Sequence, residues 1–263
     1  HLQLMNDLWQ AIDRNELRLL YQPKFPAPAG PVLGFEALLR WQHPKQGLLP
    51  PDLFLPLAEK TGLIIPIGNW VIDEACRQLR EWHLQGHTDW SMAVNLSTLQ
   101  FEQPSLVKTV LDCLTRHSVP PGMLILEVTE TTAMSNPDES VRVLTALTDA
   151  GVKASIDDFG TGYSSLLYLK RLPACELKID RAFVKELSGE SEDATIVSAI
   201  IALAKTLNLK VVAEGVETAA QQTFLTELGC NTLQGYLLGK PITAQAIMEQ
   251  CQHGEMSPSR MQS

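Results

Sequence analysis

Short apolar runs rich in β-branched residues alternate along this chain with longer stretches of helical period, and this alternation constrains the fold more than any other feature. Strands are predicted at residues 17–22, 32–39, 91–96, 124–129, 152–157, 176–180, 210–214 and 232–236. Helices are predicted between them, including 69–85, 106–117, 138–150, 194–207 and 219–228. Eight strands with helical crossovers favour a TIM-like (β/α)8 barrel, with a doubly wound open sheet as the alternative.

The first connection departs from this pattern. Between the first two predicted strands lies only the segment 23–31, which reads PKFPAPAGP. Such a segment is too short and too rich in proline for the helical crossover that joins parallel neighbours. The first strand is therefore predicted to run antiparallel to the second.

Composition describes an ordinary globular chain of 263 residues, 45% hydrophobic and 19% charged. We find no linker-like stretch, so one barrel domain is predicted over residues 1–253, followed by a disordered tail over 254–263. The longest apolar run, near 196–204, is far shorter than the roughly 20 residues that span a bilayer, and no membrane contact is predicted for this segment. Scattered cysteines without C-x-x-C spacing indicate reduced thiols in a cytoplasmic protein. A first residue other than Met indicates a module of a longer protein, whose upstream part could anchor it at the inner membrane.

The charge pattern limits the partners. The net charge is −9, and no run of Lys and Arg forms a stripe that could follow a nucleic-acid backbone. DNA and RNA polymers are therefore disfavoured as partners. A small anionic ligand stays open, because a metal ion or a few cations can reverse the local field.

Polar side chains recur in the predicted strands, although barrel strands are covered on both faces and otherwise read as continuous apolar runs. Most stand near the carboxyl end of their strand, the face on which such barrels build active sites. They are Glu36, Asn95, Glu127, Asp157 with Asp158 beside it, Lys178, Glu214 and Gln234. Two like charges 4 Å apart repel by roughly 4 kcal/mol at an effective dielectric constant near 20, so one lysine cannot balance this group, whereas divalent cations can.

The candidate metal ligands are oxygen donors from four strands: Glu36, Asn95, Glu127 and Asp157. Because these strands offer no histidine or cysteine, Mg²⁺ or Mn²⁺ is favoured over Zn²⁺. If the chain turns at the strand end, the adjacent Asp157 and Asp158 can both reach the barrel mouth and hold two ions a few ångströms apart. That arrangement is used to hydrolyse phosphodiesters.

Two other chemistries fit poorly. The triplet DFG at 158–160 occurs in protein kinases, but the chain lacks a G-x-G-x-x-G loop, H-R-D and A-P-E. Ser164 and Ser165 have no G-x-S-x-G setting. The histidines, among them His43, His83, His87 and His117, fall outside the predicted strands and are expected on the surface or on helices.

Seven motifs in a fixed order resemble the EAL domain family, whose members hydrolyse cyclic di-GMP to linear pGpG. They are EALLRW at 36–41, NLS at 95–97, EVTE at 127–130, DDFGTGYSSL at 157–166, LKID at 177–180, AEGVE at 213–217 and QGY at 234–236. The resemblance covers about residues 17–241 and implies a barrel with an antiparallel first strand. It also implies two Mg²⁺ or Mn²⁺ ions, a homodimer, and fusion to sensor, GGDEF or membrane domains.

The resemblance further implies roles for individual residues. Glu36, Asn95, Glu127 and Asp157 would bind one metal ion, and Asp158 would help to hold a second. Lys178 would contact the water and metal region, Glu214 would take a proton from the attacking water, and Gln234 would orient nearby groups. Arg40 would meet a ligand phosphate, with Gln22 and Glu217 as further contacts. Glu130 would hold the loop after the fifth strand, which links the metal site to dimerisation. Cys175 stands where an aspartate is common in the family.

Three classes of function follow from these residues. A metal-dependent cyclic di-GMP phosphodiesterase is the leading hypothesis, because the proposed acids are all present. A module that binds cyclic di-GMP as a sensor, without cleaving it, is the alternative. A protein-interaction barrel would leave the acidic cluster unexplained.

Overall fold

The computed structural model describes residues 2–162 and 165–254, where eight strands close into a ring. The strands of the ring are β1 (Leu17–Pro26), β2 (Gly34–His43), β4 (Ser91–Asn95), β5 (Leu124–Thr129), β6 (Lys153–Phe159), β7 (Glu176–Ile179), β8 (Lys210–Ala213) and β9 (Thr232–Leu233). Strand β1 runs antiparallel to both β2 and β9, and the other neighbours in the ring are parallel. The predicted barrel and its antiparallel first strand are therefore confirmed. Residues 163–164 of the predicted loop and 255–263 of the predicted tail lie outside the described residues.

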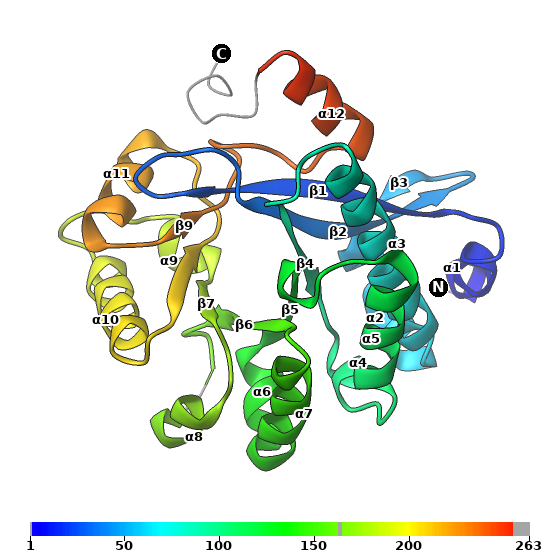
Figure 1. Cartoon of the computed structure of the whole chain (residues 1–263), viewed down its shortest axis with the longest axis horizontal. Coiled ribbons are helices and arrows are strands. Elements are labelled where there is room, and N and C mark those ends of the chain that lie inside the picture. Colours follow the sequence, from blue (N-terminus) through cyan, green and yellow to red (C-terminus); the bar gives the residue numbers. More distant parts are fainter. Residues whose placement is uncertain (1, 163–164, 255–263) are drawn as a thin grey trace.

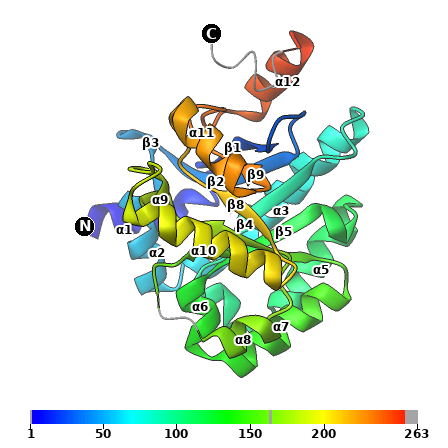
Figure 2. The same cartoon turned by 90° about the vertical axis from the view of Figure 1, so that its left-hand side faces the viewer.

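Helices cover the outside of the ring (Figure 1). The longer ones are α1 (Leu2–Ala11), α3 (Ile64–Leu84), α5 (Leu106–His117), α7 (Pro137–Asp149), α10 (Glu192–Thr206), α11 (Ala219–Leu228) and α12 (Ala244–Gln252). Shorter ones are α2 (Leu55–Thr61), α4 (Thr98–Phe101), α6 (Glu130–Ser135), α8 (Leu166–Arg171) and α9 (Arg181–Val184), with 3-10 turns η1 (Pro51–Leu53) and η2 (Pro121–Met123). The view turned by 90° shows α10 and α11 in front of the ring on the side of β8 (Figure 2).

The second strand of the barrel is longer than predicted and folds back on itself. Strand β2 continues to His43 and pairs antiparallel with the short β3 (Gly47–Leu49). The expectation that the histidines lie outside strands is wrong for His43, which is buried at the end of β2. Its Nδ1 accepts from the backbone N–H groups of Lys45 and Gln46, and its Nε2 lies 2.8 Å from Asp7 Oδ2. Because Nδ1 is an acceptor, Nε2 carries the proton and ties α1 to the barrel.

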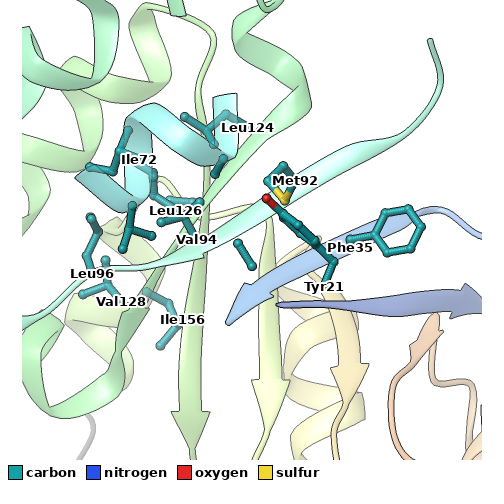
Figure 3. Close-up of a cluster of buried hydrophobic side chains, with 14 of the residues drawn as sticks. Tyr21, Phe35, Ile72, Met92, Val94, Leu96, Leu124, Leu126, Val128 and Ile156 are labelled. Carbon is teal, nitrogen blue, oxygen red and sulfur yellow. The ribbon is translucent and has the colours of Figure 1, made fainter. Parts of the chain in front are cut away.

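The outward side chains of the parallel strands form the apolar core. Met92 and Val94 of β4 and Leu126 and Val128 of β5 are fully buried and gather with Ile72 of α3 (Figure 3). Apolar residues on alternate positions of a strand point to the same face, so the positions between them point into the barrel. This alternation directs the polar side chains of the strands inward.

Within the described residues, no helix combines the length and the apolar character that a membrane crossing requires.

Candidate active site

The polar side chains predicted at the carboxyl ends of the strands meet inside one end of the barrel. Lys178 of β7 stands at their centre, and its side chain is 0% exposed. Its Nζ lies 2.5 Å from Glu127 Oε2, 2.6 Å from Glu214 Oε1 and 3.0 Å from Glu36 Oε1. Asp157 Oδ1 is 4.0 Å away. One buried ammonium thus faces four carboxylates that come from four different strands or strand ends.

Two amides complete this inner ring. Asn95, the last residue of β4, donates from Nδ2 to Glu36 Oε2 at 2.9 Å. Gln234 follows β9 and donates from Nε2 to Glu36 Oε1 at 2.9 Å and to Gln22 Oε1 at 3.0 Å. Gln22 in turn donates to the carbonyl of Gly239 at 3.1 Å. These bonds fix the Glu36 carboxylate from two sides.

A break in strand β6 explains how two adjacent aspartates reach the same mouth. The register between β6 and β7 shifts between Ile156 and Phe159, and Asp158 has a left-handed backbone with φ of 53°. Aspartate tolerates this conformation better than most residues. The Asp158 N–H donates to Asp157 Oδ1 at 2.8 Å. A regular strand would point the two side chains to opposite faces, whereas this bulge brings their carboxylates together.

The carboxylates of the site divide into two potential metal-holding groups, which share Glu214. One consists of Glu36, Glu127 and Glu214, the other of Asp157, Asp158 and Glu214, and within each group the oxygen atoms lie within 4.8 Å of one another. Oxygen donors at this spacing suit a hard divalent cation such as Mg²⁺ or Mn²⁺. Glu127 Oε1 is buried and has no partner among the described residues, so it is available to an ion. The residues present therefore fit the predicted metal.

Burial and mutual repulsion raise the pKa of several of these acids. Burial raises the pKa of Glu127 to about 8, with the Glu36 charge adding to the shift and Lys178 opposing it. Burial also raises the pKa of Asp157 to about 7 and that of Glu214 above its usual range. Without a cation, the cluster therefore retains protons near neutral pH.

Glu36 and Lys178 stay charged in this cluster. Burial raises the pKa of Glu36, but Lys178 and the bonds from Asn95 and Gln234 outweigh it and hold the pKa at about 2. Burial alone would lower the pKa of Lys178, yet the surrounding carboxylates raise it well above its usual value. The site thus contains one permanent positive charge, Lys178, surrounded by carboxyl groups. Some of these carboxyl groups retain their protons near neutral pH unless a further cation binds.

A hollow of about 380 Å³ opens directly above this cluster. The predicted residues Gln22, Glu36, Glu214, Glu217 and Gln234 all line it. Sequence reasoning assigned no role to five further lining residues, Leu38, Arg181, Gly215, Gly235 and Tyr236. A second hollow of about 310 Å³ shares Leu38 and Asn95 with the mouth, and apolar side chains of β2, α2 and α3 form part of its wall.

Arg40 lies on β2, four residues beyond Glu36, and is partly buried. Its Nη1 donates to the carbonyl of Leu39 at 2.8 Å. Burial lowers its pKa, while Tyr236 and Asp52 act in the opposite direction. Tyr236, which lines the hollow, is therefore near enough to influence this guanidinium.

Glu130 reaches the loop that follows β6. It begins α6, is 1% exposed, and accepts from the Gly160 N–H through Oε2 at 2.7 Å. Gly160 has φ of 96°, which favours glycine, and a Cβ there would lie 2.9 Å from the Phe183 ring. The predicted contact between Glu130 and this loop is thus present in the structure.

Asp180 is a site neighbour that the sequence reasoning left without a role. It follows β7 directly, caps α9 by accepting from the Ala182 N–H at 2.7 Å, and shares a hydrogen bond with Asp158. Burial, the Asp157 charge and this bond raise the pKa of Asp158 to about 6. The rule that strand ends line the mouth would have found Asp180, because it stands in the same position as Glu214 after β8.

The sequence of the chain matches a described family and curated relatives. The EAL domain family model matches residues 5–241. The bifunctional diguanylate cyclase/cyclic di-GMP phosphodiesterase MucR of Pseudomonas aeruginosa is 64% identical over 247 residues, which are 94% of this chain and 36% of that protein. The cyclic di-GMP phosphodiesterase NbdA of the same organism is 46% identical over 248 residues, which are 94% of this chain and 32% of that protein. The chain thus spans about a third of the length of these relatives.

Solved structures agree with this match. The P. aeruginosa MucR phosphodiesterase in complex with c-di-GMP has a TM-score of 0.91 at 64% identity, covering 93% of this chain and 99% of that one. The FimX EAL domain of P. aeruginosa bound to c-di-GMP has a TM-score of 0.84 at 28% identity, covering 91% of this chain and 96% of that one.

Proposed function

The chain belongs to the EAL domain family, and from this premise we propose that it hydrolyses cyclic di-GMP to linear pGpG in a metal-dependent reaction. The observation that carries the proposal is the pair of oxygen-only acidic groups that share Glu214 and surround the buried Lys178. Binding of a ligand alone does not require such a costly group of buried acids. The relatives named as cyclic di-GMP phosphodiesterases support the same activity.

Two Mg²⁺ or Mn²⁺ ions are proposed for the site. Glu36, Asn95, Glu127 and Asp157 would hold one, and Asp158 would hold the other together with Asp157 and Glu214. Two divalent cations and Lys178 would balance the five carboxylates of the two groups. When bound, such ions supply a Lewis acid for the phosphoryl oxygens and lower the pKa of water.

The proposed chemistry assigns the proton transfer to Glu214. One of its oxygens is paired with Lys178 at 2.6 Å, and the carboxylate can take a proton from the attacking water. Burial raises the pKa of Glu214, which suits a base that works near neutral pH. Lys178 holds Glu214, Glu127 and Glu36 at fixed positions around the mouth.

Substrate binding is proposed for the residues around the two hollows. Gln22, Gln234 and Glu217 line the hollow above the acids, and Arg40 would meet a phosphate oxygen through its guanidinium. Leu38 lines both hollows, and the first of them also includes Glu36 and Glu214 of the acidic cluster. This arrangement suits a cyclic dinucleotide, in which two bases flank each phosphodiester.

The remaining parts of the proposal concern the setting of the domain. Glu130 would stabilise the loop after β6 through its bond to Gly160, and a homodimer would form near that loop. Leu166 and Leu167, which begin the helix after the loop, are 61% and 68% exposed and support an interface there. A cytoplasmic location and fusion to sensor, GGDEF or membrane domains are also proposed, in line with the greater length of the relatives.

The test is product formation by the purified chain. Cyclic di-GMP is incubated with the protein and Mg²⁺ or Mn²⁺, and the nucleotides are separated by chromatography. Glu36→Gln and Glu214→Gln are compared with the control Glu227→Gln, an exposed residue near the end of α11. We expect pGpG from wild type and from the control, and a rate at least a hundredfold lower from both site variants.

Intact cyclic di-GMP after incubation with wild type and either metal would overturn the proposal. If a filter-binding assay then showed that the dinucleotide still binds, the sensor alternative would replace the enzyme.

A further inference from the structure

A second layer of polar side chains lies inside the barrel beneath the acidic cluster. Residues two positions apart on a strand point to the same side. Glu176 and Ser155 precede the inward residues Lys178 and Asp157 by two positions, and Lys24 follows the inward Gln22 by two. All three are buried, at 8%, 0% and 3% exposure. Barrel interiors at this depth are usually filled by branched apolar residues.

Lys24 is the unexpected member of this layer. A buried ammonium is costly unless an acceptor or a counter-charge compensates it. Within the described residues, the Lys24 side chain has no hydrogen bond and no carboxylate oxygen within 4.0 Å. Among the acids above, Glu127 keeps one oxygen without a partner, and the Lys24 charge lowers the pKa of Glu127. The oxygens of Glu127 lie more than 4.0 Å from Lys24 Nζ, however, so Lys24 has no direct partner in that layer.

Glu176 and Ser155 each have an unsatisfied polar atom in the same layer. Glu176 Oε1 and Ser155 Oγ are both buried without a partner. The two residues are direct register partners on β7 and β6, so their unsatisfied atoms lie on adjoining strands. An acceptor with a negative charge, a hydroxyl group and an unpaired ammonium therefore share one layer of the barrel.

A buried water molecule could supply the hydrogen-bond partner that the Lys24 ammonium, Glu176 Oε1 and Ser155 Oγ each lack. Buried water molecules typically make about three hydrogen bonds to polar groups that otherwise lack a partner. The inward position of β4 in this layer is Ala93, whose side chain is shorter than those that usually fill a barrel interior. We propose that Lys24 and Glu176 form a water-bridged ion pair inside the barrel, with the Ser155 hydroxyl as a third ligand of the buried water.

This pair also acts as a positioning element for the site above it, a step that rests on the proposed function. Glu176 and Ser155 lie on the same strands as Lys178 and Asp157 and two residues below them. Fixing the lower residues through water fixes the height and direction of the upper ones. Groups that orient metal-binding residues in this way typically change metal affinity 10- to 100-fold when removed.

Stability measurements test the pair itself. We expect Lys24→Met and Glu176→Gln each to lower Tm by roughly 6–12 °C in metal-free protein, because each leaves one buried charge unpaired. The double variant should lose less than the sum of the two. Lys210→Met is the matched control, since Lys210 is the exposed register partner of Glu176 on β8. Additive losses, or coupling of Glu176→Gln with Lys210→Met instead of Lys24→Met, would overturn the pair.

A crystal structure of the wild-type chain tests the bridge directly. Water density within hydrogen-bond distance of Lys24 Nζ, Glu176 Oε1 and Ser155 Oγ is the expected result. Direct contact between the two charged groups, or a Lys24 side chain turned to bulk solvent, would refute it. Ser155→Ala gives a variant that retains both charges, and its structure should lack that water.

Mn²⁺ binding, followed by the spectroscopic signal of free Mn²⁺, tests the positioning step without catalysis. Simple electrostatics predicts tighter binding for Lys24→Met, because the variant removes a positive charge near the site. Positioning predicts the opposite, a Kd about tenfold weaker. Unchanged or tighter binding would disprove the positioning step, while the stability and water results would still decide the ion pair.

Discussion

The two faces of a single strand, β5, have opposite chemistry. Leu126 and Val128 point outward and are fully buried against the surrounding helices. Glu127 stands between them and points inward, where its carboxylate lies 2.5 Å from Lys178 Nζ. The outer face stabilises the fold through apolar burial, whereas the inner face holds charges that oppose folding until they are paired. Residues that stabilise the fold and a residue of the candidate site therefore alternate along the same strand.

The largest effect is expected for a change on the inner face that leaves its packing intact. Glu214→Gln keeps the shape of the side chain but removes the proposed base, so kcat should fall about 10²- to 10⁴-fold. The thermal unfolding temperature should change little, because the amide can still accept from Lys178. The measurement is initial-rate kinetics with cyclic di-GMP. A variant with wild-type kcat would show that Glu214 does not take the proton.

Removing the central ammonium of Lys178 should make the stability of the protein depend on bound metal. Lys178→Met leaves four carboxylates without their counter-charge, and the free energy of unfolding of the metal-free protein should fall by about 3–5 kcal/mol. Added Mg²⁺ should restore part of this loss. Chemical unfolding with and without EDTA measures both. Equal losses in the two conditions would show that the inner face does not respond to the cation.

The matched change on the outer face should behave differently. Leu126→Ala removes buried methyl groups and should lower the free energy of unfolding by about 2–5 kcal/mol, with or without Mg²⁺. The folded fraction should keep its kcat, because Leu126 points away from the site. Denaturant titration and rate measurements at low temperature provide the check. A loss of kcat in the folded enzyme would mean that the two faces are coupled.

The smallest effect is a pH dependence of the metal-free protein. The pKa values of Glu127 and Asp157 are raised to about 8 and 7, so between pH 5 and 8 the folded state binds more protons than the unfolded state. The free energy of unfolding should therefore decrease as pH rises through this range, by roughly 1–3 kcal/mol. Glu36, with its pKa of about 2, adds a constant stabilisation in this range, because that stabilisation is lost only as pH falls below its unfolded pKa, near 4.5.

Unfolding in EDTA at pH 6, 7 and 8 measures this slope. Because the ions require ionised carboxylates, Mg²⁺ should bind more tightly at pH 8 than at pH 6 and flatten or reverse the slope. Stability that rises with pH in EDTA would contradict the raised pKa values.

Much of the site was predictable because strand ends in a barrel converge regardless of sequence detail. Glu36, Glu127 and Lys178 were expected at one mouth, and they meet there. The strand periodicity could not give the left-handed backbone of Asp158, because a bulge is a local break in that periodicity. The extension of β2 to His43 was also missed, since that part of the strand leaves the barrel and pairs with the short β3.

The inner layer beneath the site shows a different limit of sequence reasoning. Lys24 falls in the segment 23–31 that reads as a proline-rich connection, although β1 continues to Pro26, and Glu176 begins a predicted strand. A charged residue at either kind of position usually reaches solvent. Only the closed ring shows that both are buried and share one layer. Which residues lie on the same face of a strand can be predicted from their spacing. Which residues face one another across the barrel depends on how the ring of strands closes.

The most direct test of the central claim is the number of Mn²⁺ ions that the purified chain binds, measured by equilibrium titration at pH 8. The account predicts two ions for wild type and one for Asp158→Asn, because Asp158 belongs only to the second acidic group. Failure of wild type to bind Mn²⁺ would contradict the account, since the acidic cluster would then serve no cation.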